Sequence, residues 1–134
     1  MSELLPEIAY DLFAKIDFRV ATILSAEVHP NADKLLKIRL DDGTPEGRQV
    51  CAGIKAWYDP STLVGKQVII VANLEPRQLR GEISAGMILA ASDLKTDPKG
   101  EPAAIVEGQK PGPDERDVIL ITVDRSVKAG SKVS

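Results

Sequence analysis

Four side chains able to hold an anion lie within one short segment of this sequence. Asn73, Arg77, Arg80 and Ser84 supply an amide, two guanidiniums and a hydroxyl. Guanidiniums bind phosphate or carboxylate oxygens through paired hydrogen bonds, and amides and hydroxyls add neutral donors. The segment therefore predicts a surface that grasps an anionic partner.

Two apolar runs flank the segment and would hold it in place. Residues 67–73 and 86–91 have the length and composition of short buried strands. We expect an exposed loop between them, so that the polar side chains face solvent on a rigid support.

The first half of the chain also favours short strands. Ile16, Phe18 and Val20 alternate with charged residues, and a change of parity after Val20 predicts a β-bulge at that point. Asp59, Pro60 and Gly65 are placed to begin and end a single helical turn. Two further strands are expected over residues 34–41 and 48–52. Five short strands with a helical turn between the third and fourth is the order of the OB-fold.

The segments outside this barrel have their own patterns. Residues 7–15 place Ile8, Leu12 and Phe13 near helical spacing, and residues 118–123 form a late strand too apolar to lie uncovered. Residues 93–117 are rich in proline and glycine, which favours loops. We therefore expect an all-β chain: a five-stranded OB-fold barrel (16–92) with a short N-terminal helical segment (1–15) and a C-terminal extension (93–134).

The net charge of −3 hides an uneven distribution. Residues 1–33 carry 2 basic and 6 acidic side chains, residues 34–91 carry 8 and 6, and residues 92–134 carry 7 and 8. Only the middle segment is basic, so binding of a polyanion through it should be local and salt-sensitive.

Several classes of protein are disfavoured by composition. No apolar run approaches the roughly 18 residues of a membrane span, and the acidic N-terminus lacks the basic start of a signal peptide. One cysteine, Cys51, and one histidine, His29, offer neither a disulfide nor a metal cluster. We expect a cytoplasmic protein with no metal and no cofactor.

Two motifs resemble a known family. Residues 29–35 (His-Pro-Asn-Ala-Asp-Lys-Leu) are similar to the opening signature of the tRNA-binding OB domains attached to aminoacyl-tRNA synthetases. Residues 71–77 (Val-Ala-Asn-Leu-Glu-Pro-Arg), followed by Arg80, Ser84 and Met87, resemble the C-terminal domain or β subunit of methionyl-tRNA synthetase. They also resemble free-standing structure-specific tRNA-binding proteins and the endothelial-monocyte-activating polypeptide module.

The resemblance implies a function and a set of contact residues. The implied partner is tRNA, recognised by its shape and backbone without catalysis. The positions that match those the family uses for tRNA contact are Lys34, Asn73, Arg77, Arg80, Ser84 and Met87. The resemblance also implies a homodimer built by the segments that flank the barrel. It leaves two roles open: a free tRNA-binding protein, or a separate β subunit that assists methionyl-tRNA synthetase in trans.

Other interpretations stay open on the sequence alone. A secretion-type chaperone shares this barrel and binds unfolded peptide. An enzyme using Cys51 or His29 is disfavoured because neither has an obvious carboxylate partner on a matching element. Trp57 and Tyr58 could stack on a base, although we interpret them as a hydrophobic plug beneath the barrel.

Overall fold

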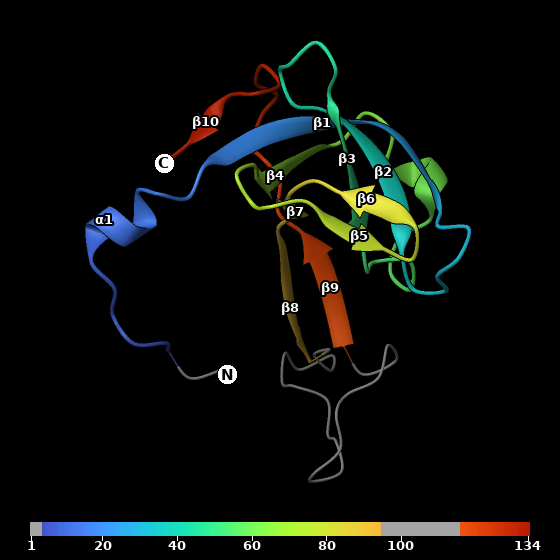
Figure 1. Cartoon of the computed structure of the whole chain (residues 1–134), viewed down its shortest axis with the longest axis horizontal. Coiled ribbons are helices and arrows are strands. Elements are labelled where there is room, and N and C mark those ends of the chain that lie inside the picture. Colours follow the sequence, from blue (N-terminus) through green and yellow to red (C-terminus); the bar gives the residue numbers. More distant parts are fainter. Residues whose placement is uncertain (1–3, 95–115) are drawn as a thin grey trace, which may run out of the picture.

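Five antiparallel strands form the body of the protein (Figure 1). The computed structural model describes residues 4–94 and 116–134. The strands lie in the order β3-β2-β1-β4-β7. Their bounds are β1 Phe18–Val28, β2 Leu36–Asp41, β3 Arg48–Ala52, β4 Gln67–Val71 and β7 Met87–Ile88, with the 3-10 turn η1 Pro60–Thr62 between β3 and β4. The expected five-stranded, all-β barrel is confirmed.

Alternating apolar residues fill the barrel. On β2, Leu36, Ile38 and Leu40 are fully buried, whereas the residues between them are accessible to solvent. Leu63, which follows η1, is also fully buried and closes one end of the core. The turn itself forms as expected, because the Asp59 carboxylate accepts from the Ser61 N–H at 2.9 Å and Gly65 adopts a positive φ of 88°.

The predicted bulge after Val20 is wrong in position. β1 pairs with β4 without interruption from Phe18 to Thr22, and its register against β2 shifts between Ile23 and Ser25 instead. Val20 and Ala21 are both buried because both faces of β1 are covered there. Ala21 belongs to the barrel core, whereas Val20 lies opposite Ile69 on the other face of the sheet. Two consecutive buried residues on β1 therefore did not require a β-bulge at Val20.

The polar segment after β4 is not a plain loop. It contains a hairpin of β5 Arg77–Leu79 and β6 Glu82–Ser84. Arg80 and Gly81 connect the two strands, both with positive φ, at 52° and 90°. A two-residue turn with both residues in this region matches the right-handed twist of the flanking strands. Arg80 thus occupies a conformation that usually favours Asn or Gly.

This segment closes the barrel. Among the described residues, the outer edge of β3 has no strand partner beyond β2 in the main sheet, and unpaired edge groups must be satisfied. The Ala85 N–H donates to Gln49 O at 2.9 Å, and the Cys51 N–H donates to Ser84 Oγ at 2.9 Å. One backbone bond and one hydroxyl bond therefore take the place of a regular strand ladder.

The flanking segments differ in part from expectation. Helix α1, Tyr10–Phe13, is shorter than the predicted 7–15. β8 Ala90–Leu94 pairs with β9 Arg116–Leu120, so the late strand begins earlier and ends earlier than the predicted 118–123. β10 Lys132–Val133 pairs with the start of β1. Most of the expected loop region 93–117 lies outside the described residues.

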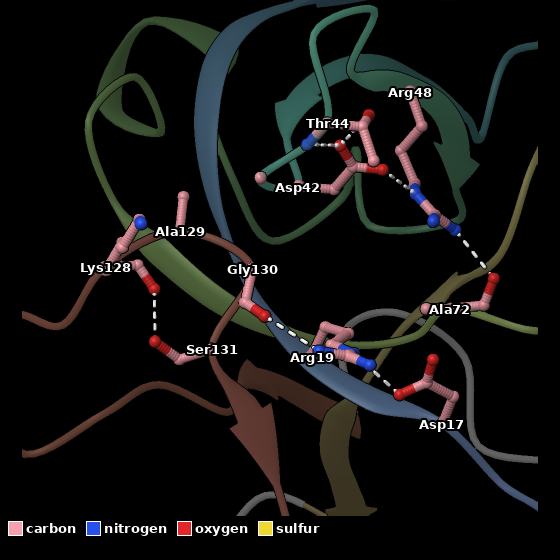
Figure 2. Close-up of a pocket in the computed structure, with 11 residues that line it drawn as sticks. Asp17, Arg19, Asp42, Thr44, Arg48, Ala72, Lys128, Ala129, Gly130 and Ser131 are labelled. Carbon is pink, nitrogen blue, oxygen red and sulfur yellow. Dashed lines mark hydrogen bonds and ion pairs between the residues drawn. The ribbon is translucent and has the colours of Figure 1, made fainter.

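An ion pair braces the closure from inside. Arg48 Nε donates to Asp42 Oδ2 at 2.8 Å, and its Nη1 donates to Ala72 O at 2.9 Å (Figure 2). The same Nη1 also donates to Ala85 O at 3.1 Å. One guanidinium thus joins the loop after β2 to the end of β4 and to the residue after β6. Burial by itself would raise the pKa of Asp42, but hydrogen bonds from Thr44 and Arg48 outweigh it and lower that pKa below 3.8.

Replacement of Asp42 should remove the ion pair with Arg48 and lower the unfolding free energy. Asp42→Asn leaves the Arg48 guanidinium, with a side chain only 19% exposed, without its counter-charge, and we expect a loss of about 3 kcal/mol in unfolding free energy at pH 7. Urea denaturation measures this loss. The equivalent change at the exposed Asp124, whose side chain is 95% accessible, should alter stability by less than about 0.5 kcal/mol.

The same carboxylate should make the unfolding free energy of the wild type fall at acidic pH. Since the pKa of Asp42 is lower in the folded chain, its stabilisation is present in full above the ordinary value of 3.8 and disappears as the pH falls through the native pKa. The stability difference between wild type and Asp42→Asn should therefore shrink below that pH. An unchanged difference at pH 3 and pH 7 would contradict the assignment.

Candidate nucleic-acid interface

An open groove lies between the turn after β1 and the β5–β6 hairpin. Its volume is about 650 Å³. One wall comes from the turn and the other from the hairpin, and the lining residues are Asn31, Ala32, Asp33, Lys34, Leu35, Gln78, Leu79 and Arg80. The fold thus brings Lys34 and Arg80, 46 positions apart in the sequence, to one groove.

His29 holds the two walls together. Its side chain is 2% exposed. Nδ1 accepts from the Asn31 N–H at 3.0 Å, so a neutral ring carries its proton on Nε2 and donates it to Leu79 O at 2.9 Å. The Asn31 amide adds a longer bond of 3.4 Å to Arg80 O. His29 is therefore a fixed link between turn and hairpin, with both nitrogens occupied.

Two cations, Lys34 and Arg80, line the groove, and a third, Arg77, lies on β5 of the hairpin outside the groove lining. Lys34, Arg77 and Arg80 are exposed, and within the described residues none of them forms an ion pair or donates a side-chain hydrogen bond. Three solvated cations on neighbouring elements form a local positive surface that a polyanion can neutralise without first breaking internal pairs.

The acidic residue on the hairpin points elsewhere. Glu82 accepts from Lys37 Nζ at 3.4 Å and from Gln49 Nε2 at 3.3 Å. The Gln49 amide, helped by Lys37, holds the pKa of Glu82 below its ordinary value. Glu82 therefore stays charged and neutralises Lys37 over β2 and β3, instead of Arg77 or Arg80.

Asn73 and Ser84 are occupied by the fold itself. Asn73 Oδ1 accepts from the Asp17 N–H at 2.8 Å, and its Nδ2 donates to Lys15 O at 2.6 Å. Ser84 is 5% exposed and accepts from the Cys51 N–H. These two residues anchor the ends of the segment that carries Arg77 and Arg80.

Met87 lies apart from the groove on β7, opposite Val71 of β4. Its side chain is 46% exposed and does not line the groove. The structure therefore gathers Lys34, Arg77 and Arg80 around the turn and hairpin, with Met87 on a neighbouring strand.

A second pocket of about 490 Å³ has two of its three cationic lining residues in ion pairs (Figure 2). Its two arginines are already paired: Arg19 with Asp17 at 2.7 Å, and Arg48 with Asp42 at 2.8 Å. Arg19 also donates to Gly130 O at 3.2 Å, which ties the C-terminal segment to β1. These arginines stabilise the barrel. Of the cations that line this pocket, only Lys128 is outside the ion pairs of the described residues, whereas the groove has two such cations, Lys34 and Arg80.

Sequence reasoning misses part of the groove. The pattern marks His29 only as a turn residue, and it does not identify Asn31, Asp33, Gln78 and Leu79 as lining residues. The signal for His29 is the presence of a single imidazole in a turn, which needs two polar partners when buried. Its second partner is 50 residues away, so no local pattern could name it.

Groups suited to metal binding or to thiol catalysis are not brought together in the described residues. In the part of the chain that the structure describes, no group of three or more His, Cys, Asp or Glu residues could hold a metal ion. Burial raises the pKa of the Cys51 thiol, and the nearby Glu82 carboxylate raises it further, which disfavours the nucleophilic thiolate. Nor is any helix of the described residues long and apolar enough to cross a membrane.

The fold and the groove agree with a family assignment. Residues 18–132 match the family model described as "Putative tRNA binding domain". The chain belongs to this tRNA-binding domain family.

Its relatives include methionine–tRNA ligases. The chain is 43% identical over 131 residues to the ligase of Methanocaldococcus jannaschii, a match that covers 98% of the chain and 17% of the ligase. It is 60% identical over 85 residues to the ligase of Chlorobium limicola, covering 63% of the chain and 12% of the ligase. The chain thus spans less than a fifth of the length of these relatives.

Two solved structures share the whole fold. A MetRS-related protein from Pyrococcus horikoshii is 28% identical, with a TM-score of 0.72, and the match covers 97% of this chain and all of that one. The CsaA chaperone protein from Picrophilus torridus is 27% identical, with a TM-score of 0.70, over 96% of this chain and all of that one.

Removal of the Ser84 hydroxyl should test the closure. Ser84→Ala leaves the Cys51 N–H without its partner at the edge of β3, and we expect a loss of about 1 to 3 kcal/mol in unfolding free energy. Urea denaturation measures it, with Ser25→Ala on the exposed part of β1 as the matched control. Equal stabilities of the two variants would show that the hydroxyl contributes nothing to closure.

Proposed function

We propose that this protein binds tRNA through the groove between the turn at 29–35 and the β5–β6 hairpin. The observation that carries the proposal is that two exposed cations, Lys34 and Arg80, line this groove, with a third, Arg77, on the same hairpin; none of the three is in an ion pair within the described residues. Membership of the tRNA-binding domain family supplies the partner.

The chemistry of these side chains suits backbone and shape recognition. Each arginine can bind a phosphate through two parallel N–H donors, and Lys34 can act as a point charge. Phosphate contacts fix position and orientation but carry little sequence information. Met87 offers an apolar contact to a sugar or base, while Asn73 and Ser84 contribute by holding the loop ends. No reacting group is needed, so the protein performs no catalysis.

Binding of this kind would serve a catalytic partner. The methionine–tRNA ligases carry a matching segment within a much longer chain, and this chain would do the same work in trans. By holding tRNA beside a synthetase, it would raise the effective concentration of the substrate. The proposal places the protein in the cytoplasm, where tRNA is charged.

A homodimer would cover the exposed N-terminal segment. Figure 1 shows α1 and the preceding residues running away from the barrel. Leu5 is 88% exposed, Ile8 63% and Leu12 50%, which is a large apolar surface for a segment without cover. We propose that residues 1–15 and the extension 93–134 flank the barrel domain 16–92 and form the contact between two copies.

The chaperone remains a second candidate. The resemblance to the CsaA chaperone protein extends over nearly the whole chain at 27% identity, and the exposed apolar residues could hold unfolded peptide. The unpaired cations favour RNA, because an unfolded polypeptide presents no regular anionic backbone. Competition between tRNA and a denatured polypeptide separates the two functions.

The central test removes the hairpin arginines without disturbing the hairpin. Arg80→Asn keeps a residue that tolerates positive φ before Gly81, and Arg77→Gln keeps a polar side chain at an exposed position. The double variant should bind total tRNA more weakly, with a salt slope shallower by about two units, one for each phosphate that is no longer bound. A filter-binding series over salt concentration measures both.

The control removes two charges elsewhere. Arg125 and Lys132 are exposed and do not line the groove, so Arg125→Gln with Lys132→Gln changes the net charge equally. Its salt slope should match that of the wild type. If both double variants lose affinity alike, binding depends on net charge and not on the hairpin. If denatured polypeptide displaces tRNA and binds more tightly, the chaperone function is supported instead.

The dimer is tested at the N-terminal segment. Leu5→Asp with Leu12→Asp places charges on the proposed contact and should convert a dimer of twice 14.4 kDa into a monomer of 14.4 kDa. Size-exclusion chromatography with light scattering measures the mass. Asp11→Asn, on the same segment, should leave the dimer intact. A wild type that is monomeric at micromolar concentration would contradict the proposal.

A further inference from the structure

A smaller pocket adjoins the groove at Asp33 and Lys34. Its volume is about 260 Å³, and it is lined by Asp33, Lys34, Gly53, Lys55, Ala56 and Trp57. Asp33 and Lys34 also line the groove. The two hollows are therefore neighbours, with Asp33 and Lys34 in the lining of both.

The walls of this pocket are chemically unlike those of the groove. Trp57 provides an aromatic surface, and Ala56 and Gly53 add little bulk. Lys55 is exposed, and no ion pair within the described residues uses it. Lys34 and Lys55 thus contribute two cations to the lining of a largely apolar hollow, together with the Asp33 carboxylate.

The tryptophan ring is held in place. Its Nε1 donates to Arg116 O at 2.9 Å, so the polar edge of the indole is satisfied at the start of β9. Trp57 is half-buried and lines the pocket. A fixed aromatic side chain loses little conformational freedom when a planar ligand stacks on it.

The neighbouring aromatic residue has a different role. Tyr58 packs against the barrel core, and its hydroxyl accepts from the Leu120 N–H at 3.0 Å. The interpretation of Trp57 and Tyr58 together as a hydrophobic plug therefore fits Tyr58 only.

We propose that this pocket takes an unpaired nucleobase of the bound RNA, stacked on Trp57, with the flanking phosphates at Lys34 and Lys55. Stacking on aromatic side chains beside basic residues is how proteins hold single-stranded bases. Asp33 can accept a hydrogen bond from an N–H of the base. The inference rests on the proposed function, since the pocket shares Asp33 and Lys34 with the groove.

The base pocket adds a selectivity that the cations lack. Phosphates occur on every nucleic acid, but an extruded or terminal base is present only where pairing ends. A duplex with every base paired offers nothing to Trp57 unless the cost of unstacking is met. The protein would thereby favour folded RNA with unpaired bases over continuous duplex.

The fluorescence of Trp57 reports the pocket directly, because it is the only tryptophan of the chain. The full-length protein is titrated with total tRNA, with a single-stranded eight-residue oligocytidylate and with a blunt-ended 16-base-pair RNA duplex. The anisotropy of labelled tRNA measures affinity in parallel. We expect quenching by tRNA and by the oligonucleotide, and none by the duplex at saturation.

Two variants separate stacking from the bond to Arg116. Trp57→Phe and Trp57→Leu both remove the indole N–H, but only the first keeps a ring. Trp57→Leu should weaken tRNA binding about tenfold, and Trp57→Phe by less than about threefold. If Trp57→Leu fails to fold, Lys55→Gln replaces it, with an expected loss of about one unit in the salt slope.

The outcomes distinguish this inference from the function on which it rests. Tight tRNA binding that depends on Arg77 and Arg80 but leaves Trp57 unquenched would overturn the base pocket alone. Equal quenching by the duplex, or equal losses in the two Trp57 variants, would do the same. Quenching by a denatured polypeptide but not by RNA would assign the pocket to peptide. If the protein does not bind tRNA at low salt, both the proposed tRNA-binding function and the base pocket are contradicted.

Discussion

The closure of the barrel at the edge of β3 is the constraint on which the rest of the structure depends. The other neighbouring strands of the barrel pair through backbone ladders, but the outer edge of β3 meets the segment after β5 through Ser84 Oγ and the Ala85 N–H. Arg48 adds a charged brace from behind, joined to Asp42 and to Ala85 O. The segment that closes the fold is the one that carries Arg77 and Arg80. The binding surface therefore inherits its rigidity from the closure.

The distribution of ion pairs separates structural cations from available ones. Arg19, Lys37 and Arg48 each meet a carboxylate within 3.4 Å. A polyanion that recruited them would first have to displace these partners, which offsets much of the gain. Lys34, Arg77 and Arg80 carry no such cost within the described residues. The preference for the groove over the pocket at Arg19 and Arg48 thus follows from which charges are already neutralised, and not from pocket size alone.

The barrel could be predicted well from the sequence because its signals are local. Alternation on β2, the Asp59–Gly65 turn and the apolar run at β4 each appear within a few residues, and each is confirmed. The bulge is misplaced because burial on both faces of β1 at Val20 and Ala21 depends on which segments cover the sheet. That information lies in partners such as Ile69, almost fifty positions away.

The candidate site divides along the same line. Residue types and spacing identify Arg77 and Arg80 as potential contacts, since guanidiniums on a polar segment are visible in any sequence. The bonds of Asn73 to Lys15 and Asp17, and of His29 to Leu79, join distant segments, so they could not be predicted from the sequence.

Arg80 combines local and long-range information. Its positive φ is imposed by a hairpin that no pattern predicted, and this turn brings Arg80 to the same groove as Lys34. A residue with a backbone cost of about 1 kcal/mol in this conformation is better explained by what its side chain reaches than by the turn, for which Asn or Gly would be more stable.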